Sequence, residues 1–226
     1  MTLQALIFDV DGTLAETEDL HRHAFNQTFA AAGLDWHWTQ DDYRDLLKVT
    51  GGKERMRFHR DQRREAGPDD ATIATLHRDK TDRYGQAIAA GDIVLRPGVR
   101  SLVAQAREEG LALAIATTTS RANVDALIRA CWRAPADEVF DVIAAGDEVD
   151  AKKPAPDVYE LALTRLGVPP NAALAFEDTR NGVLSATAAG LRVVVTPSVY
   201  SAGEDFADAS VVLRDLSKFK LQDWIG

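Results

Sequence analysis

The chain has 226 residues, of which 46% are hydrophobic, and its formal net charge at pH 7 is −9. This length suits one large domain or a domain with a modest insertion. The acidic balance argues against nucleic acid and anionic membranes as partners, so an anionic substrate would need a local basic patch. The chain has one cysteine and lacks a leader-like or membrane-spanning apolar stretch, so we expect a cytoplasmic protein, and a monomer by default.

The first apolar run, residues 3–8, predicts a buried strand of a parallel sheet that ends in Asp9, Asp11 and Gly12. Two carboxylates two residues apart lie on one side of an extended chain, and their burial is costly without compensation. A divalent cation that prefers hard oxygen ligands, such as Mg²⁺, would compensate them. An ordinary acidic turn explains a bare Asp-x-Asp equally well, so the rest of the chain must decide.

A helical insertion is predicted after this strand. Residues 17–32 have helical periodicity, with His21 on the apolar face, and residues 36–91 mix aromatic and charged residues without strand signals. We therefore expect a small helical domain over residues 16–91, inserted into a core formed by residues 1–15 and 92–226. Spacing alone leaves open whether His21 is a half-buried structural histidine or a substrate contact.

The insertion contains a basic stretch, residues 44–65, with eight Lys and Arg against four Asp and Glu. Within it, Thr50, Gly51 and Gly52 predict a helix N-terminus that suits a phosphate group. Farther on, Lys80 lies on an apolar helix face near His77. A solvated basic helix face and a snorkelling lysine explain these features as well as phosphate binding does.

From residue 96 onward, strand and helix signals alternate. The predicted strands are residues 111–116, 142–145, 173–176, 193–196 and 211–213, and the predicted helices are residues 99–109, 122–131, 156–166 and 180–189. This alternation predicts an α/β fold with a doubly wound parallel sheet and helices on both faces. Ligands of such sheets bind at the C-terminal ends of the strands.

Polar side chains follow four of the predicted strands. The first ends in Asp9 and Asp11, the second in the hydroxyl run 117–120, the third leads to Lys153, and the fourth ends in the pair 177–178. Caps, loops and helix starts explain each of them singly. Together they supply a nucleophile, a phosphate cradle, a cation and metal ligands. This set favours Mg²⁺-assisted phosphoryl transfer through an aspartyl-phosphate.

These four motifs, centred on Asp9, Thr117, Lys153 and Asp178, resemble those of the haloacid-dehalogenase-like hydrolases, in the family's order. The resemblance implies a Rossmann-like core with a helical cap. It also implies that Asp9 is the nucleophile, Asp11 the general acid/base, Thr117 a phosphate ligand and Lys153 the lysine between nucleophile and phosphate. Mg²⁺ would be held by Asp9, the Asp11 backbone carbonyl, Asp178 and, directly or through water, Glu177.

Glu16 stands where many sugar-phosphate members have Asp. It is followed by three shorter motifs besides the hydroxyl run 117–120, namely Leu20-His21-Arg22, Thr50-Gly51-Gly52-Lys53-Glu54 and His77-Arg78-Asp79-Lys80. Together these features are similar to the CbbY-type phosphatases, which are associated with xylulose-1,5-bisphosphate, an inhibitor of the Calvin-cycle enzyme Rubisco. The resemblance implies a phosphoric monoester hydrolase that acts on a small sugar bisphosphate. The substrate-binding residues that it implies are Glu16, His21, Thr50, Gly51, Gly52, Lys53, Glu54, Arg55, His77, Lys80, Thr118, Thr119, Ser120, Arg121 and Asn123.

Two other functions stay open. A sugar phosphomutase of the β-phosphoglucomutase type would return the phosphoryl group to sugar instead of water, although Thr13 after Asp11-Gly12 favours the phosphatase. A receiver-like signalling module that is phosphorylated on aspartate also uses acids, Thr and Lys around Mg²⁺. Its usual domain is much shorter and lacks a helical insertion over the site.

Overall fold

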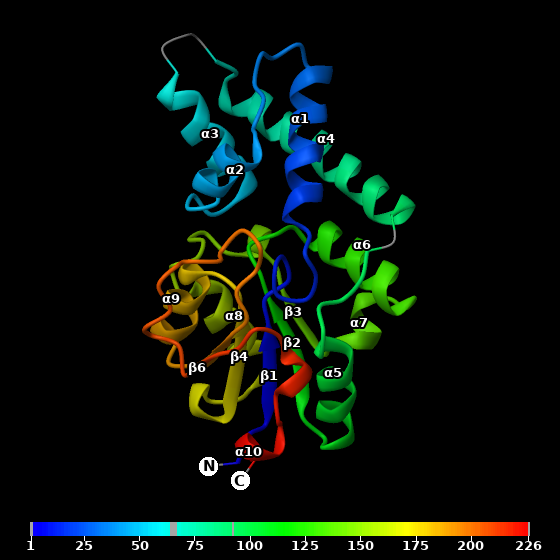
Figure 1. Cartoon of the computed structure of the whole chain (residues 1–226), viewed down its shortest axis with the longest axis vertical. Helices are drawn as coiled ribbons and strands as arrows, with labels where there is room; N and C mark the ends of the chain where they lie inside the picture. The colour runs from blue at the N-terminus through cyan, green and yellow to red at the C-terminus, as the bar shows by residue number, and fades with distance from the viewer. Residues whose placement is uncertain (1, 64–66, 92, 226) are drawn as a thin grey trace.

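A computed structural model describes residues 2–63, 67–91 and 93–225 of the chain (Figure 1). The last two residues of the basic stretch, Arg64 and Glu65, and the predicted domain boundary at Asp92 lie outside the described residues. In the described part of the chain, no helix has both the length and the apolar character that crossing a membrane requires.

A six-stranded parallel sheet forms the centre of the molecule, in the order β3-β2-β1-β4-β5-β6. Its strands are β1 (Ala5–Phe8), β2 (Ala112–Ala116), β3 (Val142–Ala144), β4 (Ala173–Glu177), β5 (Arg192–Val195) and β6 (Val211–Val212). The central strand β1 pairs with β2 and β4, so that Ile7 lies beside Ala114 and Ala175. The strand order reverses at β1, which is the switch point where such sheets bind ligands.

Helices cover both faces of the sheet because alternate side chains of its buried strands are apolar on both sides. Leu6 and Phe8 pack in one cluster with α5 (Val99–Glu108) and α6 (Arg121–Trp132). Ala5 and Ile7 pack in the other cluster with α8 (Asp157–Leu166) and α9 (Arg180–Ala188). The predicted doubly wound α/β fold is confirmed.

Four helices stand over the C-terminal ends of the strands (Figure 1). They are α1 (Glu18–Ala31), α2 (Gln40–Leu46), α3 (Gly52–Gln62) and α4 (Asp70–Ala90). This helical unit has its own aromatic core, in which Phe25, Phe29 and Trp38 are fully buried. Tyr200, from the loop after β5, belongs to the same cluster and so joins the unit to the sheet domain.

The structure adds short elements that the sequence analysis did not predict. They are α2, α7 (Ala136–Val139), α10 (Gln222–Ile225) and the 3₁₀ turns η1 (Gly146–Glu148), η2 (Pro170–Ala172) and η3 (Leu216–Lys218). Each is too short for helical periodicity to be visible. Local start signals are present at α2, which has a capping box between Thr39 and Asp42, and at η3, where the Asp215 side chain accepts a hydrogen bond from the Ser217 N–H.

Candidate active site

Side chains from three strand ends meet at the end of β1. The Lys153 Nζ lies 2.7 Å from Asp9 Oδ1, 2.6 Å from Glu177 Oε1 and 2.9 Å from the Ala116 carbonyl oxygen. Its side chain is only 4% exposed, so these contacts are shielded from water. The sheet topology therefore brings together the nucleophile candidate and the lysine, as the order of the motifs predicted.

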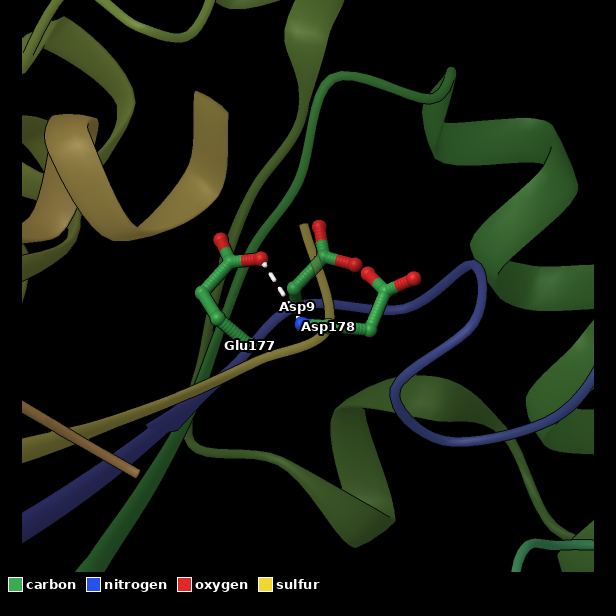
Figure 2. Close-up of side chains that lie close together, drawn as sticks. All are labelled: Asp9, Glu177 and Asp178. Atoms are coloured by element: carbon green, nitrogen blue, oxygen red, sulfur yellow. Dashed lines mark hydrogen bonds between the residues drawn. The ribbon is translucent and has the colours of Figure 1, made fainter. Parts of the chain in front are cut away.

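Three buried carboxylates surround this point: Asp9, Glu177 and Asp178 rise from the ends of β1 and β4 (Figure 2). Each offers an oxygen that lies within 4.8 Å of the others. Burial, the largest cause, raises the pKa of Asp9 to about 8, and Glu177 and Asp11 add to this while Lys153 opposes it. Burial and the neighbouring carboxylates likewise raise the pKa of Asp178 well above its usual range. Among the described residues, Lys153 thus pairs with two of the three carboxyl groups, Asp9 and Glu177.

This cluster fits a divalent cation. All its donors are carboxylate oxygens, the ligands that Mg²⁺ prefers, and its excess negative charge is buried without a matching cation among the described residues. Gly12, at φ +82°, passes so close to Asp178 that a Cβ atom there would lie 2.2 Å from its Oδ2. The backbone is therefore shaped around the Asp178 carboxylate, and Asp9 and Asp178 are the residues best placed to hold the metal.

Glu177 is already engaged by protein donors. Its Oε1 accepts hydrogen bonds from Lys153 and from the Tyr159 hydroxyl, each at 2.6 Å, and its Oε2 accepts one from the Asp178 backbone N–H at 3.3 Å. The dashed line in Figure 2 marks the last of these bonds. Glu177 therefore orients Lys153 in addition to bringing charge to the cluster.

Asp11 has a different environment from Asp9, although it is only two residues away. Its Oδ1 accepts hydrogen bonds from the Thr17 hydroxyl at 2.5 Å and from His21 Nε2 at 2.9 Å. Burial alone would raise the pKa of Asp11, but His21 and Thr17 overcome this effect and lower it to about 2. The two aspartates therefore differ in pKa by several units, a separation typical of groups with different roles in catalysis.

His21 connects Asp11 to the helical unit. Its Nδ1 lies 2.5 Å from Lys80 Nζ, and its ring stacks on Tyr84 with centroids 3.9 Å apart. When Lys80 carries its proton it donates to Nδ1, and the proton of the neutral imidazole then lies on Nε2 and faces Asp11. Burial lowers the pKa of Lys80 to about 7. His21 is thus buried on the apolar face of α1 and also lines the cavity beside Asp11, and its contact with substrate stays a prediction.

A cavity of about 330 Å³ lies between the strand ends and the helical unit. Most of the predicted site residues line it: Asp9, Asp11, His21, Thr50, Gly51, Gly52, Lys53, Glu54, Arg55, His77, Lys80, Thr117, Thr118, Thr119, Ser120, Asn123, Lys153 and Asp178. The predicted helix N-terminus is present, because α3 begins at Gly52. The structure therefore brings the insertion and the strand ends to one space.

Two of the predicted substrate-binding residues do not line this cavity. The Glu16 carboxylate lies 3.3 Å from Arg96 Nε and accepts a hydrogen bond from the Val199 backbone N–H at 3.4 Å. The Arg121 guanidinium pairs with Asp125 and Asp137 on the outer side of α6. Both side chains have protein partners outside the cavity, and their contacts with substrate stay a prediction.

The Arg55 side chain also has protein partners. It lines the cavity, but its guanidinium donates hydrogen bonds to the Leu46 carbonyl at 3.1 Å and to the Tyr43 hydroxyl at 2.9 Å. These bonds tie α3 to α2 and occupy guanidinium donors of a residue that was predicted to bind substrate. Lys53 is more available, since its Nζ has only a long contact, 3.7 Å, with Asp147.

Several residues that line the cavity were missed by the sequence analysis, among them Glu18, Tyr43 and Asn181. Tyr43 donates a hydrogen bond to Glu18 Oε2 at 3.1 Å, and burial is the main cause of the raised Glu18 pKa. Glu18 precedes His21 by three residues, so it lies on the same face of α1, which was a usable signal. Asn181 reaches the Thr50 hydroxyl across 131 residues of sequence, and no local pattern predicts that contact.

The chain matches known proteins over nearly its whole length. The model of a family described as haloacid dehalogenase-like hydrolase matches residues 6–196. Protein CbbY of Rhodobacter capsulatus is 63% identical over 217 residues, which cover 96% of this chain and 95% of that protein. The crystal structure of CbbY from Rhodobacter sphaeroides in complex with phosphate has a TM-score of 0.92 and 52% identity, with 96% of each chain covered. A mutant of that protein in complex with xylulose-1,5-bisphosphate gives a TM-score of 0.92, 53% identity and the same coverage.

These matches agree with the arrangement of the four motifs around the end of β1. They confirm two predictions from the sequence, a phosphatase among the hydrolases and a similarity to the CbbY type. The chain belongs to the haloacid dehalogenase-like hydrolase family.

Proposed function

We propose that the chain is a Mg²⁺-dependent phosphatase of a small sugar bisphosphate, and specifically of xylulose-1,5-bisphosphate. One observation carries the proposal: Asp9, held by Lys153 at 2.7 Å, and Asp11, held by His21 at 2.9 Å, face the same cavity. The similar protein that was crystallised with xylulose-1,5-bisphosphate supports the choice of substrate. Removal of this compound would protect Rubisco from inhibition.

Asp9 acts as the nucleophile and attacks phosphorus in line with the leaving sugar oxygen. Its raised pKa shows that it is reluctant to ionise alone, so a nearby positive charge is needed. Lys153 supplies part of that charge at Oδ1 and also neutralises the phosphate oxygens. Mg²⁺, held by Asp9, Asp178 and the Asp11 backbone carbonyl, would supply the remaining charge for the phosphoryl group.

Asp11 transfers the protons. Without substrate it is ionised, because its pKa is about 2. The negative charge of an incoming phosphate favours its protonated form, which then protonates the leaving oxygen. Once ionised again, Asp11 accepts a proton from the water that hydrolyses the aspartyl-phosphate. Thr17 and His21 hold the same carboxylate oxygen throughout and so fix its orientation.

The helical unit, residues 16–91, serves as a cap that closes over the substrate. Its side of the cavity offers the N-terminus of α3 together with Lys53, Lys80 and His77. The free N–H groups and the two lysines suit the second phosphate of a bisphosphate. His77 packs against Gly52, where a Cβ atom would lie 2.7 Å from its Nε2, so the helix start needs glycine there.

Measurement of phosphate release from xylulose-1,5-bisphosphate tests the proposal, with ribulose-1,5-bisphosphate and hexose phosphates measured separately as comparison substrates. We expect Mg²⁺-dependent release that Asp9→Asn abolishes. Metal-independent activity, or an active Asp9→Asn protein, would refute the mechanism, and equal rates with ribulose-1,5-bisphosphate would refute the substrate. Isomerised sugar phosphate without free phosphate would identify a mutase instead, and a stable phosphoprotein without turnover would identify a signalling module.

A further inference from the structure

Arg96 lies in the second connection between the helical unit and the sheet domain and contacts the loops that follow β1 and β5. Its guanidinium donates hydrogen bonds to the backbone carbonyls of Gly12, of Thr196 at 2.6 Å and of Pro197 at 2.7 Å. Its Nε lies 3.3 Å from Glu16 Oε1, and its side chain is only 10% exposed. One buried side chain therefore joins the turn after β1, the loop after β5 and the first connection to the helical unit.

The backbone around Arg96 strengthens this junction. The Arg96 N–H donates to the Leu14 carbonyl at 2.8 Å, and Ala15 forms an antiparallel bridge with Leu95. Ala15 also bridges to Asp11, and its carbonyl accepts a hydrogen bond from the Gly12 N–H at 2.9 Å. The two connections thus lie side by side and are bonded to the turn that carries Asp11.

The loops that Arg96 holds are those that position the two key carboxylates. Gly12 follows Asp11 directly and packs against the Asp178 carboxylate. The loop after β5 provides Ser201, whose hydroxyl donates to the Asp178 carbonyl at 2.6 Å. Carbonyl oxygens can only accept hydrogen bonds, so they do not bond to one another. The Arg96 guanidinium lies between the two loops and donates to the carbonyls of both, which allows these carbonyls to lie close together.

We propose that Arg96 is a positioning residue for catalysis: it fixes the Asp11-Gly12 turn against the loop after β5 and couples it to the connections of the helical unit. The planar guanidinium is required because its donors serve three carbonyls and one carboxylate at once, which an ammonium cannot reproduce. Glu16 neutralises the charge from the solvent side. This inference rests on the proposed role of Asp11 as general acid.

Two substrates with different leaving groups distinguish a role of Arg96 in positioning Asp11 from a role in protein stability. A sugar alkoxide needs a proton from Asp11, whereas 4-nitrophenolate leaves without one, so a displaced Asp11 slows aspartyl-phosphate formation only with the sugar substrate. For Arg96→Met we expect this step to be about 10- to 100-fold slower with xylulose-1,5-bisphosphate and changed less than about threefold with 4-nitrophenyl phosphate. Rapid-quench measurement and the nitrophenolate burst report the two rates.

Three further variants make the outcome unambiguous. Asp11→Asn must show the same leaving-group dependence; if it does not, the proposed role of Asp11 fails and not the role of Arg96 alone. Arg100→Met is the matched control, because Arg100 is exposed and donates only to the Cys131 carbonyl among the bonds described. Arg96→Lys, which keeps the charge, should lie between wild type and Arg96→Met and also serves if Arg96→Met does not fold.

The positioning role is overturned if Asp11→Asn shows the leaving-group dependence while Arg96→Met keeps the wild-type ratio of the two rates. It is equally overturned if Arg96→Met slows both substrates alike, because the effect would then not act through Asp11. If neither Arg96 variant folds, the positioning role is also overturned, because Arg96 would then be needed for structure.

Discussion

The buried carboxylates at the ends of β1 and β4 predict that one substitution makes the metal-free protein more stable. Asp9, Glu177 and Asp178 offer oxygens within 4.8 Å of one another. At an effective dielectric constant of about 20, two unit charges at this distance repel each other by about 3 kcal/mol. Asp178→Asn removes the negative charge that Asp178 carries when it is ionised.

Part of this repulsion is already avoided, because burial raises the pKa of Asp9 to about 8 and also raises the pKa of Asp178 well above its usual range. We therefore expect Asp178→Asn to stabilise the metal-free protein by about 1 to 2 kcal/mol. In a chain of this size that corresponds to a rise in Tm of roughly 2 to 8 °C. The same variant should lose the stabilisation by Mg²⁺, which is about 2.7 kcal/mol for wild type at 100 times its Kd.

Differential scanning calorimetry in EDTA and in Mg²⁺ measures both effects. Asp137→Asn is the matched control, since Asp137 is an exposed carboxylate that pairs with Arg121, and its removal should change stability by less than about 0.5 kcal/mol. A lower Tm of Asp178→Asn in EDTA would mean that the carboxylate repulsion is not significant. A full Mg²⁺-induced rise in the variant would mean that Asp178 does not hold the metal.

Three other predictions concern the same cluster. Between about pH 5 and 7 unfolding releases the proton of Asp9, because the pKa of this group is about 8 in the folded protein and lower in the unfolded one. The free energy of unfolding of the metal-free protein should therefore fall by up to about 1.4 kcal/mol for each pH unit of increase. A Tm in EDTA that rises with pH would contradict this. Tyr159→Phe removes only the bond to Glu177 and should cost about 1.5 to 3 kcal/mol by urea unfolding, whereas an unchanged midpoint would show that the bond is not significant. Gly182→Ala would place a Cβ atom 1.9 Å from Glu177 Oε2 and should reduce phosphate release, whereas Gly85→Ala, in open space on α4, should leave it unchanged; equal activities would refute the steric argument.

The sequence predicted the sheet and the central site well because both depend on local patterns combined with topology. Three of the site residues directly follow a strand: Asp9, Thr117 and Asp178. Lys153 lies in the connection between β3 and α8. Parallel strands bring their C-terminal ends to one edge of the sheet. Once the sheet was predicted, the meeting of these residues followed. The lengths of the apolar runs fixed the strands to within one or two residues.

Side-chain direction was harder to predict. Arg121 follows Ser120 by one residue, but the rotation of the helix turns it outward, where Asp125 and Asp137 pair with it. Glu16 is exposed at the first connection and meets Arg96, 80 residues later in the sequence. Such partners are set by tertiary packing, and no motif at either residue records them.

On the proposed function, the charge of the cavity explains why an acidic chain would need a metal to bind an anionic substrate. Composition predicted that a local basic patch must offset the net charge of −9. The basic residues are present, but acids accompany them: seven Lys and Arg and eight Asp and Glu line the cavity. A divalent cation at Asp9 and Asp178 would change the formal charge of this lining from −1 to +1. On the proposed function, then, the lysines select where each phosphate of the substrate lies, and the metal makes the cavity attractive to it.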